Sequence, residues 1–110
     1  MGTTKTNLFD DEVNEIALLI KALAHPARIS IVNYLIRTEN CICNDIVAEL
    51  SLAQPTVSQH LKELKNAGII KGNISGKAIC YCINPEIFNK LTQFFTTTSQ
   101  RLSCENENCC

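Results

Sequence analysis

The stretch QPTVSQHLKELKNAGII, Gln54 to Ile70, decides the fold of this chain. Its apolar residues recur at i, i+4 and i+7 and so share one helix face: Val57, Leu61 and Leu64. Polar or small residues take the opposite face: Pro55, Gln59, Lys62 and Asn66. Gly68 suits a left-handed helix C-cap. The stretch therefore predicts a helix with one buried face and one solvent-facing surface, which stops at Gly68.

Three further helices are expected before this one. Asp10 or Asp11 can cap the first, whose apolar stripe is Val13, Ile16, Ala17, Ile20 and Leu23. Pro26 fits the first turn of a second helix running roughly to Ile36, with the stripe Ile29, Val32, Leu35 and Ile36. Asn44 is a good N-cap for a short third helix, DIVAEL. Residues 51–53 then form the three-residue bridge that a helix-turn-helix requires.

The sequence after Gly68 indicates a hairpin and a last helix. Residues 69–74 and 78–83 alternate in polarity as strands do, and Ser75-Gly76 is a plausible tight turn. Pro85 opens a helix with the stripe Ile87, Leu91, Phe94, Phe95 and Leu102. The order ααααββα predicts a mainly α (α+β) winged helix-turn-helix. We expect one domain over residues 1–103 and a cysteine-rich tail over 104–110.

Charge and composition restrict the function. The net charge of −1 argues mildly against a nucleic-acid binder, but residues 54–82 carry four lysines against one glutamate. Residues 1–24 carry four acidic residues against two lysines. No apolar run approaches membrane-spanning length, so we expect a cytoplasmic protein without a membrane partner. No phosphate loop, acid pair or cysteine–histidine spacing points to an enzyme.

The polar surface of the fourth helix has the chemistry of a DNA-reading element. A helix in the major groove needs side chains that bond base edges and phosphates. The candidates are Gln54, Thr56, Ser58, Gln59 and Lys62, with Lys71 and Lys77 of the hairpin as phosphate contacts. An ordinary solvated helix face is the alternative, and the three-residue bridge before it and the hairpin after it favour DNA.

Three stretches resemble a known family, the ArsR/SmtB repressors: ALAHPARISIVNYL, LAQPTVSQHLKELKNAGII and GKAICYCINP. The resemblance covers roughly residues 16–95. It implies a small, dimeric, metal-responsive winged-helix repressor that pairs through its first and last helices and binds an inverted repeat in DNA. Ala53 departs from the family, which usually has a serine there to cap the recognition helix. Residues 85–102 hold no histidine, so the family's zinc and nickel site on the last helix is not expected.

Seven cysteines in a reducing compartment point to metal binding or redox sensing. Three of them, Cys104, Cys109 and Cys110, lie in the polar tail CENENCC. Three thiolates without a fourth ligand suit As(III) or Sb(III) better than zinc, which prefers four ligands. The simpler interpretation is a frayed terminus whose cysteines bind nothing.

Two other cysteine pairs are weaker candidates. Cys41 and Cys43 are the second candidate site, and the family's arsenic and cadmium sensors often carry a cysteine pair in this neighbourhood. Cys80 and Cys82 share the face of a strand that should point outward, and the alternative to a ligand role is that they are simple substitutions. His60 is expected to be a packed, hydrogen-bonded side chain, and His25 a structural bridge between helices.

The leading hypothesis is therefore a dimeric repressor without a permanent cofactor that trivalent arsenic or antimony releases from its operator. One alternative makes cadmium or zinc the inducer. Another makes the thiols a redox or persulfide switch. A small thiol metal carrier is a hypothesis from a different class, but it leaves the recognition helix and hairpin unexplained.

Overall fold

The computed structural model describes residues 8–38, 46–75 and 78–102 of the 110-residue chain. Its elements are α1 (Asp11–Leu23), α2 (Pro26–Thr38), α3 (Ile46–Leu50), α4 (Gln54–Asn66), β1 (Ile70–Ser75), β2 (Ala78–Ile83) and α5 (Pro85–Arg101). This order confirms the predicted mainly helical winged helix-turn-helix.

Helix α1 begins at Asp11, directly after Asp10, one of the two residues predicted to cap it. The Asp10 side chain accepts a hydrogen bond of 3.1 Å from the backbone N–H of Val13, and two acidic residues follow in the first turn. The expected apolar stripe was only partly right. The buried residues are Ile16, Leu19 and Ala22, while Val13, Ala17 and Ile20 are exposed. The segment IALLIKAL is apolar almost all round, so periodicity could not choose the buried face.

Helix α2 shows the same kind of difference. Its buried residues are Ile31, Val32 and Leu35, whereas the predicted Ile29 and Ile36 are exposed. The buried face of α2 packs against α3, α4 and β2. Ile31 of α2 is fully buried, as are Leu64 of α4 and Ile69, so these residues lie at the centre of the core.

The hairpin is a two-stranded antiparallel sheet whose register pairs Ile70 with Ile83 and Lys71 with Cys82. The first strand starts at Ile70, one residue later than predicted, because Ile69 closes the end of α4 through its N–H bond to the carbonyl of Leu64. The Ile69 carbonyl then accepts from Asn84 N–H at 2.9 Å, which ties the hairpin's two ends together. Gly76 of the expected tight turn lies outside the described residues.

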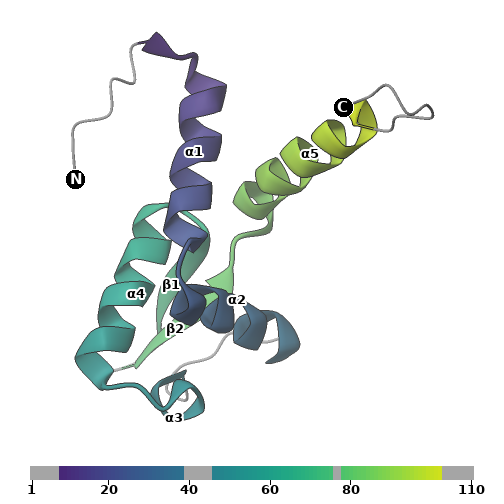
Figure 1. Cartoon of the computed structure of the whole chain (residues 1–110). Coiled ribbons are helices and arrows are strands. Elements are labelled where there is room, and N and C mark those ends of the chain that lie inside the picture. Colours follow the sequence, from purple (N-terminus) through teal and green to yellow (C-terminus); the bar gives the residue numbers. More distant parts are fainter. Residues whose placement is uncertain (1–7, 39–45, 76–77, 103–110) are drawn as a thin grey trace.

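The helices divide into a body and two diverging arms (Figure 1). Helices α2, α3 and α4 and the hairpin form the body, and α1 and α5 extend from it. The far end of α5 lies at the opposite end of the molecule from α3 (Figure 1). Among the helices of the described ranges, none is long and apolar enough to cross a bilayer.

Candidate nucleic-acid interface and thiol positions

Helix α4 forms without a side-chain N-cap. Ala53 occupies the cap position and makes no side-chain hydrogen bond, so the departure from the expected serine leaves the first turn uncapped. Pro55 in the first turn partly compensates, because its missing N–H is one of those that a helix start leaves unbonded. The positive φ angles of Ser51 (54°) and Gly68 (83°) set the turns that enter and leave the helix.

The inner face of α4 is held by the core. Val57, Leu61 and Leu64 are all buried, as predicted, and Leu64 is fully inaccessible to solvent. Ile69 and Ile70, which follow the helix, are buried to the same degree. The helix is therefore anchored along its length and at its C-terminal end, so its outer surface has a fixed orientation.

The residues predicted to read DNA lie on that outer surface. The five on α4 are all exposed: Gln54, Thr56, Ser58, Gln59 and Lys62. Lys71 is exposed on β1, the strand that follows α4, while Lys77 lies outside the described residues. The structure adds a hydrogen bond of 3.1 Å from Gln59 Nε2 to Glu63 Oε1. The i, i+4 spacing of these two residues could have revealed it.

A cluster of His25, Arg28 and His60 joins α4 to the junction of α1 and α2. Arg28 Nε donates to His60 Nδ1 at 3.1 Å, and Arg28 Nη1 donates to the Ala22 carbonyl at 3.1 Å. The His25 and His60 rings lie 4.4 Å apart, and His25 Nδ1 accepts from the N–H of Ala27. Both histidines thus have the structural roles that the sequence predicted.

Arg28 was not identified from the sequence as the residue that links these elements. Its only signal was its position two residues after His25-Pro26, which says nothing of a partner 32 residues away. Burial lowers the pKa of His60, and the neighbouring His25 and Arg28 lower that pKa further. A neutral His60 is what the geometry requires, because its Nδ1 accepts a bond from a cation.

The described cysteines differ from expectation. Cys80 and Cys82 were expected on an outward, solvent-facing side of β2. Cys80 is instead only 8% exposed and Cys82 is half-buried. Both sulfurs are disulfide-bonded in the structure. Tyr81 and Ile83 pack on the core from one face of β2. Cys80 lies on the other face of the strand and is nevertheless buried.

Cys41, Cys43, Cys104, Cys109 and Cys110 lie outside the described residues. Within the described ranges, no group of three or more histidine, cysteine or carboxylate side chains could hold a metal ion.

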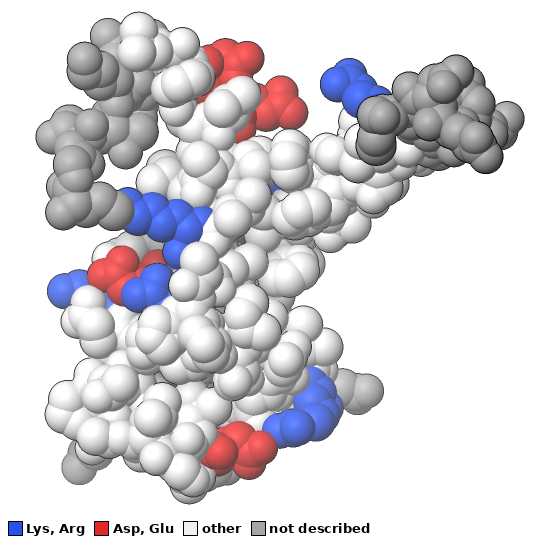
Figure 2. Space-filling model, in the orientation of Figure 1, with Lys and Arg blue, Asp and Glu red and all other residues white. Residues whose placement is uncertain are grey.

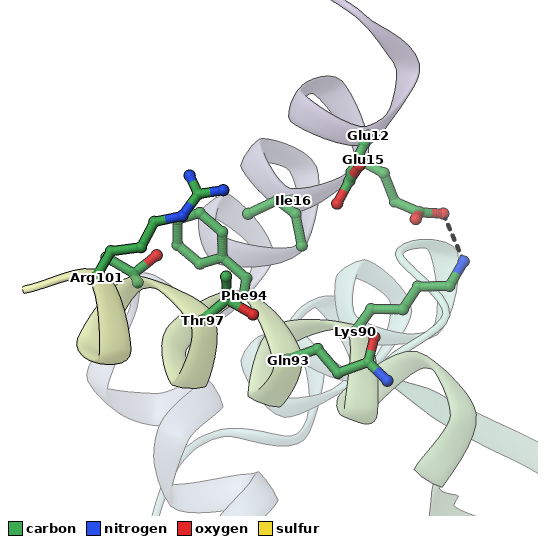
Figure 3. Close-up of a pocket in the computed structure, with 9 residues that line it drawn as sticks. Glu12, Glu15, Ile16, Lys90, Gln93, Phe94, Thr97 and Arg101 are labelled. Carbon is green, nitrogen blue, oxygen red and sulfur yellow. Dashed lines mark hydrogen bonds and ion pairs between the residues drawn. The ribbon is translucent and has the colours of Figure 1, made fainter.

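Between α1 and α5 lies an open cleft of about 540 Å³ (Figure 3). Glu15 on α1 and Lys90 on α5 form an ion pair of 2.9 Å at one end of it, and Arg101 lies toward the other (Figure 3). Most of the large apolar side chains that are exposed in the described part of the chain lie on these two helices or next to their ends. They are Leu8, Phe9, Val13, Leu18, Ile20, Phe94, Phe95 and Leu102.

The charge is gathered in small groups rather than on one broad surface. On the face in Figure 2, acidic side chains gather at the N-terminal end of α1, and the middle of the view is largely uncharged. Two acidic residues lie in the first turn of α1. This distribution leaves α4 and β1, with Lys62, Lys65 and Lys71 exposed, as the more basic surface.

Comparison with known proteins agrees with this geometry. A model of bacterial regulatory proteins of the arsR family matches residues 25–71. The HTH-type transcriptional repressor SmtB of Mycobacterium tuberculosis is 46% identical over 63 residues, which are 57% of this chain. The match covers only 46% of that repressor's length. A biofilm growth-associated repressor of Agrobacterium fabrum is 38% identical over 81 residues, which cover 74% of this chain and 68% of that protein.

A third relative is the arsenical resistance operon repressor of Staphylococcus xylosus, 28% identical over 84% of this chain and 90% of its own length. Two solved structures share the fold. One is an ArsR family transcriptional regulator, with a TM-score of 0.70 and 19% identity over 89% of this chain and 97% of its own. The other is a homodimeric winged helix-turn-helix domain from Mycobacterium bovis, with a TM-score of 0.66 and 18% identity over 98% of both chains.

Proposed function

Because the chain belongs to the ArsR family of bacterial regulatory proteins, we propose that it is a dimeric transcriptional repressor in the cytoplasm. It binds an inverted repeat in operator DNA and is released by trivalent arsenic or antimony. The observation that carries the proposal is the exposed polar surface of α4, held rigidly by a buried inner face and followed directly by a hairpin.

In this proposal, helix α4 contacts the DNA bases. Gln54 and Gln59 can each pair with adenine, Lys62 favours guanine or phosphate, and Thr56 and Ser58 bond either type of group. The Gln59 amide keeps a second Nε2 hydrogen and its Oε1 free of the bond to Glu63, so it can contact a base while that carboxylate stays beside it. Lys71 and Lys77 on the hairpin supply phosphate contacts that fix the register of the helix.

In this proposal, helices α1 and α5 form the dimer interface. Leu18 is 62% exposed and Phe95 is 54% exposed, and large apolar side chains exposed in number on two neighbouring helices favour a protein interface there. Phe94 and Phe95 lie edge to face at 5.2 Å, so they present one aromatic group from the arm formed by α5. A twofold dimer through these helices carries two copies of α4, which accounts for an operator with inverted symmetry.

The inducer binds thiols. Cys104, Cys109 and Cys110 follow the end of α5 in sequence and form the proposed site, and Cys41 and Cys43 form the second candidate. Three thiolates match trivalent arsenic or antimony, and the repressor from Staphylococcus xylosus is named for arsenical resistance. Cadmium, zinc and a redox or persulfide signal remain the alternatives.

Release follows if the inducer binds more tightly to a conformation that cannot hold DNA. A ligand shifts an equilibrium only by its differential affinity for the two states. The tail follows α5, and α5 belongs to the proposed dimer interface. Gathering three tail thiols around one ion would therefore alter how α5 packs in the dimer, and with it the separation of the two α4 helices.

Fluorescence anisotropy on a duplex from the chain's own upstream region tests this proposal. Wild type and a chain ending at Ser103 would be titrated with arsenite under reducing conditions, beside Cys41→Ser/Cys43→Ser. Release of wild type and of the 41/43 variant, but not of the truncated chain, supports the tail site. Release of the truncated chain transfers the sensor to the second candidate. Absence of release from all three refutes arsenite as the inducer.

A further inference from the structure

Both histidines of the chain meet in one cluster, where α1, α2 and α4 join. The C-terminal end of α1 lies next to the start of α2 and beside α4 (Figure 1). The rings of His25 and His60 are 4.4 Å apart, and Arg28 bonds to the second of them. Imidazole is the side chain whose ordinary pKa lies closest to neutral pH. Histidine titration in this chain is therefore confined to this junction.

Each of these rings accepts a hydrogen bond at Nδ1. The backbone N–H of Ala27 donates to His25 at 3.0 Å, and Arg28 Nε donates to His60 at 3.1 Å. Neither a backbone N–H nor a guanidinium can accept a bond, so both imidazoles carry their proton on Nε2. The next proton can bind only at Nδ1, which turns that acceptor into a donor. Protonation of either histidine therefore breaks its hydrogen bond.

The bond at His60 connects elements that are distant in the chain. Arg28, in the first turn of α2, also donates from Nη1 to the carbonyl of Ala22 in the last turn of α1, at 3.1 Å. A single guanidinium thus ties the end of α1 to α4. His60 is only 9% exposed, so an imidazolium there would lie buried beside the guanidinium of Arg28. Like charges in contact repel, which adds to the loss of the bond.

Two carboxylates lie on the same side of α4 as Arg28. A cavity of about 510 Å³ beside Arg28 is bordered by three further charged groups: Glu15, Lys21 and Glu63. Both carboxylates already have partners, since Glu15 pairs with Lys90 at 2.9 Å and Glu63 accepts a hydrogen bond from Gln59 at 3.1 Å. Neither is bonded to the His60 ring.

The other described elements that pack on α4 add one carboxylate and one cation. Glu49 of α3 is paired with Arg37 at 2.7 Å, and Lys71 of β1 is exposed. Within the described residues, no carboxylate forms a hydrogen bond or ion pair with His60. A proton on His60 would therefore place a positive charge beside Arg28 without a counter-ion in contact.

We propose that this cluster is a proton-operated joint, in which protonation of His60 detaches α4 from Arg28 and releases the protein from DNA. The inference rests on the proposed function, in which α4 contacts DNA and α1 belongs to the dimer interface. The Arg28 bridge ties these two helices together, so its loss would change the separation of the two α4 helices in the dimer. An exposed histidine near phosphates would act in the opposite direction, because its charge strengthens binding to DNA as the pH falls.

The working range of the joint lies in mild acid. Burial lowers the pKa of His60, and the neighbouring His25 and Arg28 lower that pKa further. The neutral ring that accepts from Arg28 therefore predominates above pH ~6.5, and the bond is lost as the pH falls through the lowered pKa. Affinity for DNA should accordingly be complete above pH ~6.5 and fall below it.

The joint itself is tested without DNA, by NMR on the full-length chain. Proton–nitrogen correlation spectra of the histidine rings would be recorded from about pH 8 to about pH 5. His60 should carry its proton on Nε2 at the upper end, and the backbone amides of α4 and of residues 22–27 should shift with the midpoint of the His60 ring. The matched variant is His60→Gln, whose amide oxygen can accept from Arg28 but takes up no proton in this range. Its α4 amides should lose that transition.

Arg28→Met is a second variant, which keeps the test decisive if His60→Gln does not fold. It removes both the donor at Nδ1 and the neighbouring positive charge, so the midpoint of the His60 ring should rise. A midpoint equal to that of wild type would overturn the role of Arg28 in the joint.

The effect on DNA is tested by fluorescence anisotropy on the operator duplex over the same pH range, at fixed ionic strength and without metal. Wild type should lose affinity by up to about tenfold per protomer for each pH unit below the His60 midpoint, whereas His60→Gln should not show this loss. Circular dichroism at each pH separates release from unfolding.

Two results would overturn the proposal: affinity that stays constant or rises while His60 titrates, or α4 amides that do not follow the ring. Failure to bind the operator at any pH would instead refute the proposed function. The NMR titration then decides on its own whether the joint responds to protons.

Discussion

The hydrogen bond between Arg28 and His60 predicts a measurable coupling between α2 and α4. It joins a guanidinium nitrogen to an imidazole nitrogen at 3.1 Å, and His60 is only 9% exposed. Hydrogen bonds with a charged partner contribute about 1.5–3 kcal/mol, and partial exposure of Arg28 reduces the expected coupling to about 1–2 kcal/mol. We expect this value from a double-mutant cycle of Arg28→Met and His60→Leu.

Each single change should cost more than the coupling alone. Arg28→Met also removes the bond to the Ala22 carbonyl, and it leaves His60 Nδ1 without its donor. His60→Leu leaves the Arg28 Nε–H without its acceptor. A buried polar group that loses its partner costs about 1–3 kcal/mol. The double variant should therefore be more stable than the sum of the two single losses predicts.

The assay is urea unfolding followed by circular dichroism at one fixed protein concentration, because formation of the proposed dimer would make the apparent stability concentration-dependent. The matched control is the ion pair of Glu15 and Lys90, with both side chains 45% exposed. A cycle of Glu15→Gln and Lys90→Met should give only about 0.2–1 kcal/mol. An Arg28–His60 coupling no larger than that of the control would refute the reasoning.

Three further outcomes are expected. The lowered pKa of His60 means that the folded state binds a proton less readily than the unfolded state. The contribution of His60 to stability should therefore be complete above pH ~6.5 and fall as the pH drops below that value. If urea midpoints fall equally steeply with pH in the His60→Gln variant, this prediction is wrong. Gly68→Ala should cost about 1 kcal/mol because φ is 83°, although a Cβ atom would have room there; unchanged thermal stability would count against it. Lys71→Gln should weaken operator binding and reduce the slope of log K against log salt by about 0.9 per protomer, or about 1.8 for the proposed dimer, while Lys90→Gln, on α5, should leave the slope unchanged.

The recognition helix was predictable because its signals are local. Val57, Leu61 and Leu64 fall on one face at a spacing that only a helix satisfies, and Gly68 ends it through its own backbone freedom. The five proposed base-reading residues are exposed because they occupy the opposite face. Here periodicity and burial agree, so the sequence was sufficient.

The buried face of α1 was not predictable in this way. A helix that is apolar on several sides can pack on any of them, and contact with α4 and α5 selected Ile16, Leu19 and Ala22. The remaining apolar residues, such as Leu18, are left on the surface. In the proposed dimer these residues contact a second chain. The apolar periodicity of a single helix does not distinguish residues buried in the chain's own core from residues buried against a partner chain.

The sequence by itself determined the order of the elements, the exposed polar surface of α4 and the family, since each depends on residues a few positions apart. Tertiary structure alone decided that Arg28 bonds to His60 and that Cys80 is buried rather than solvent-facing. Both results depend on contacts between elements that are far apart in the chain. The sequence near Arg28 or Cys80 has no local pattern that signals such contacts.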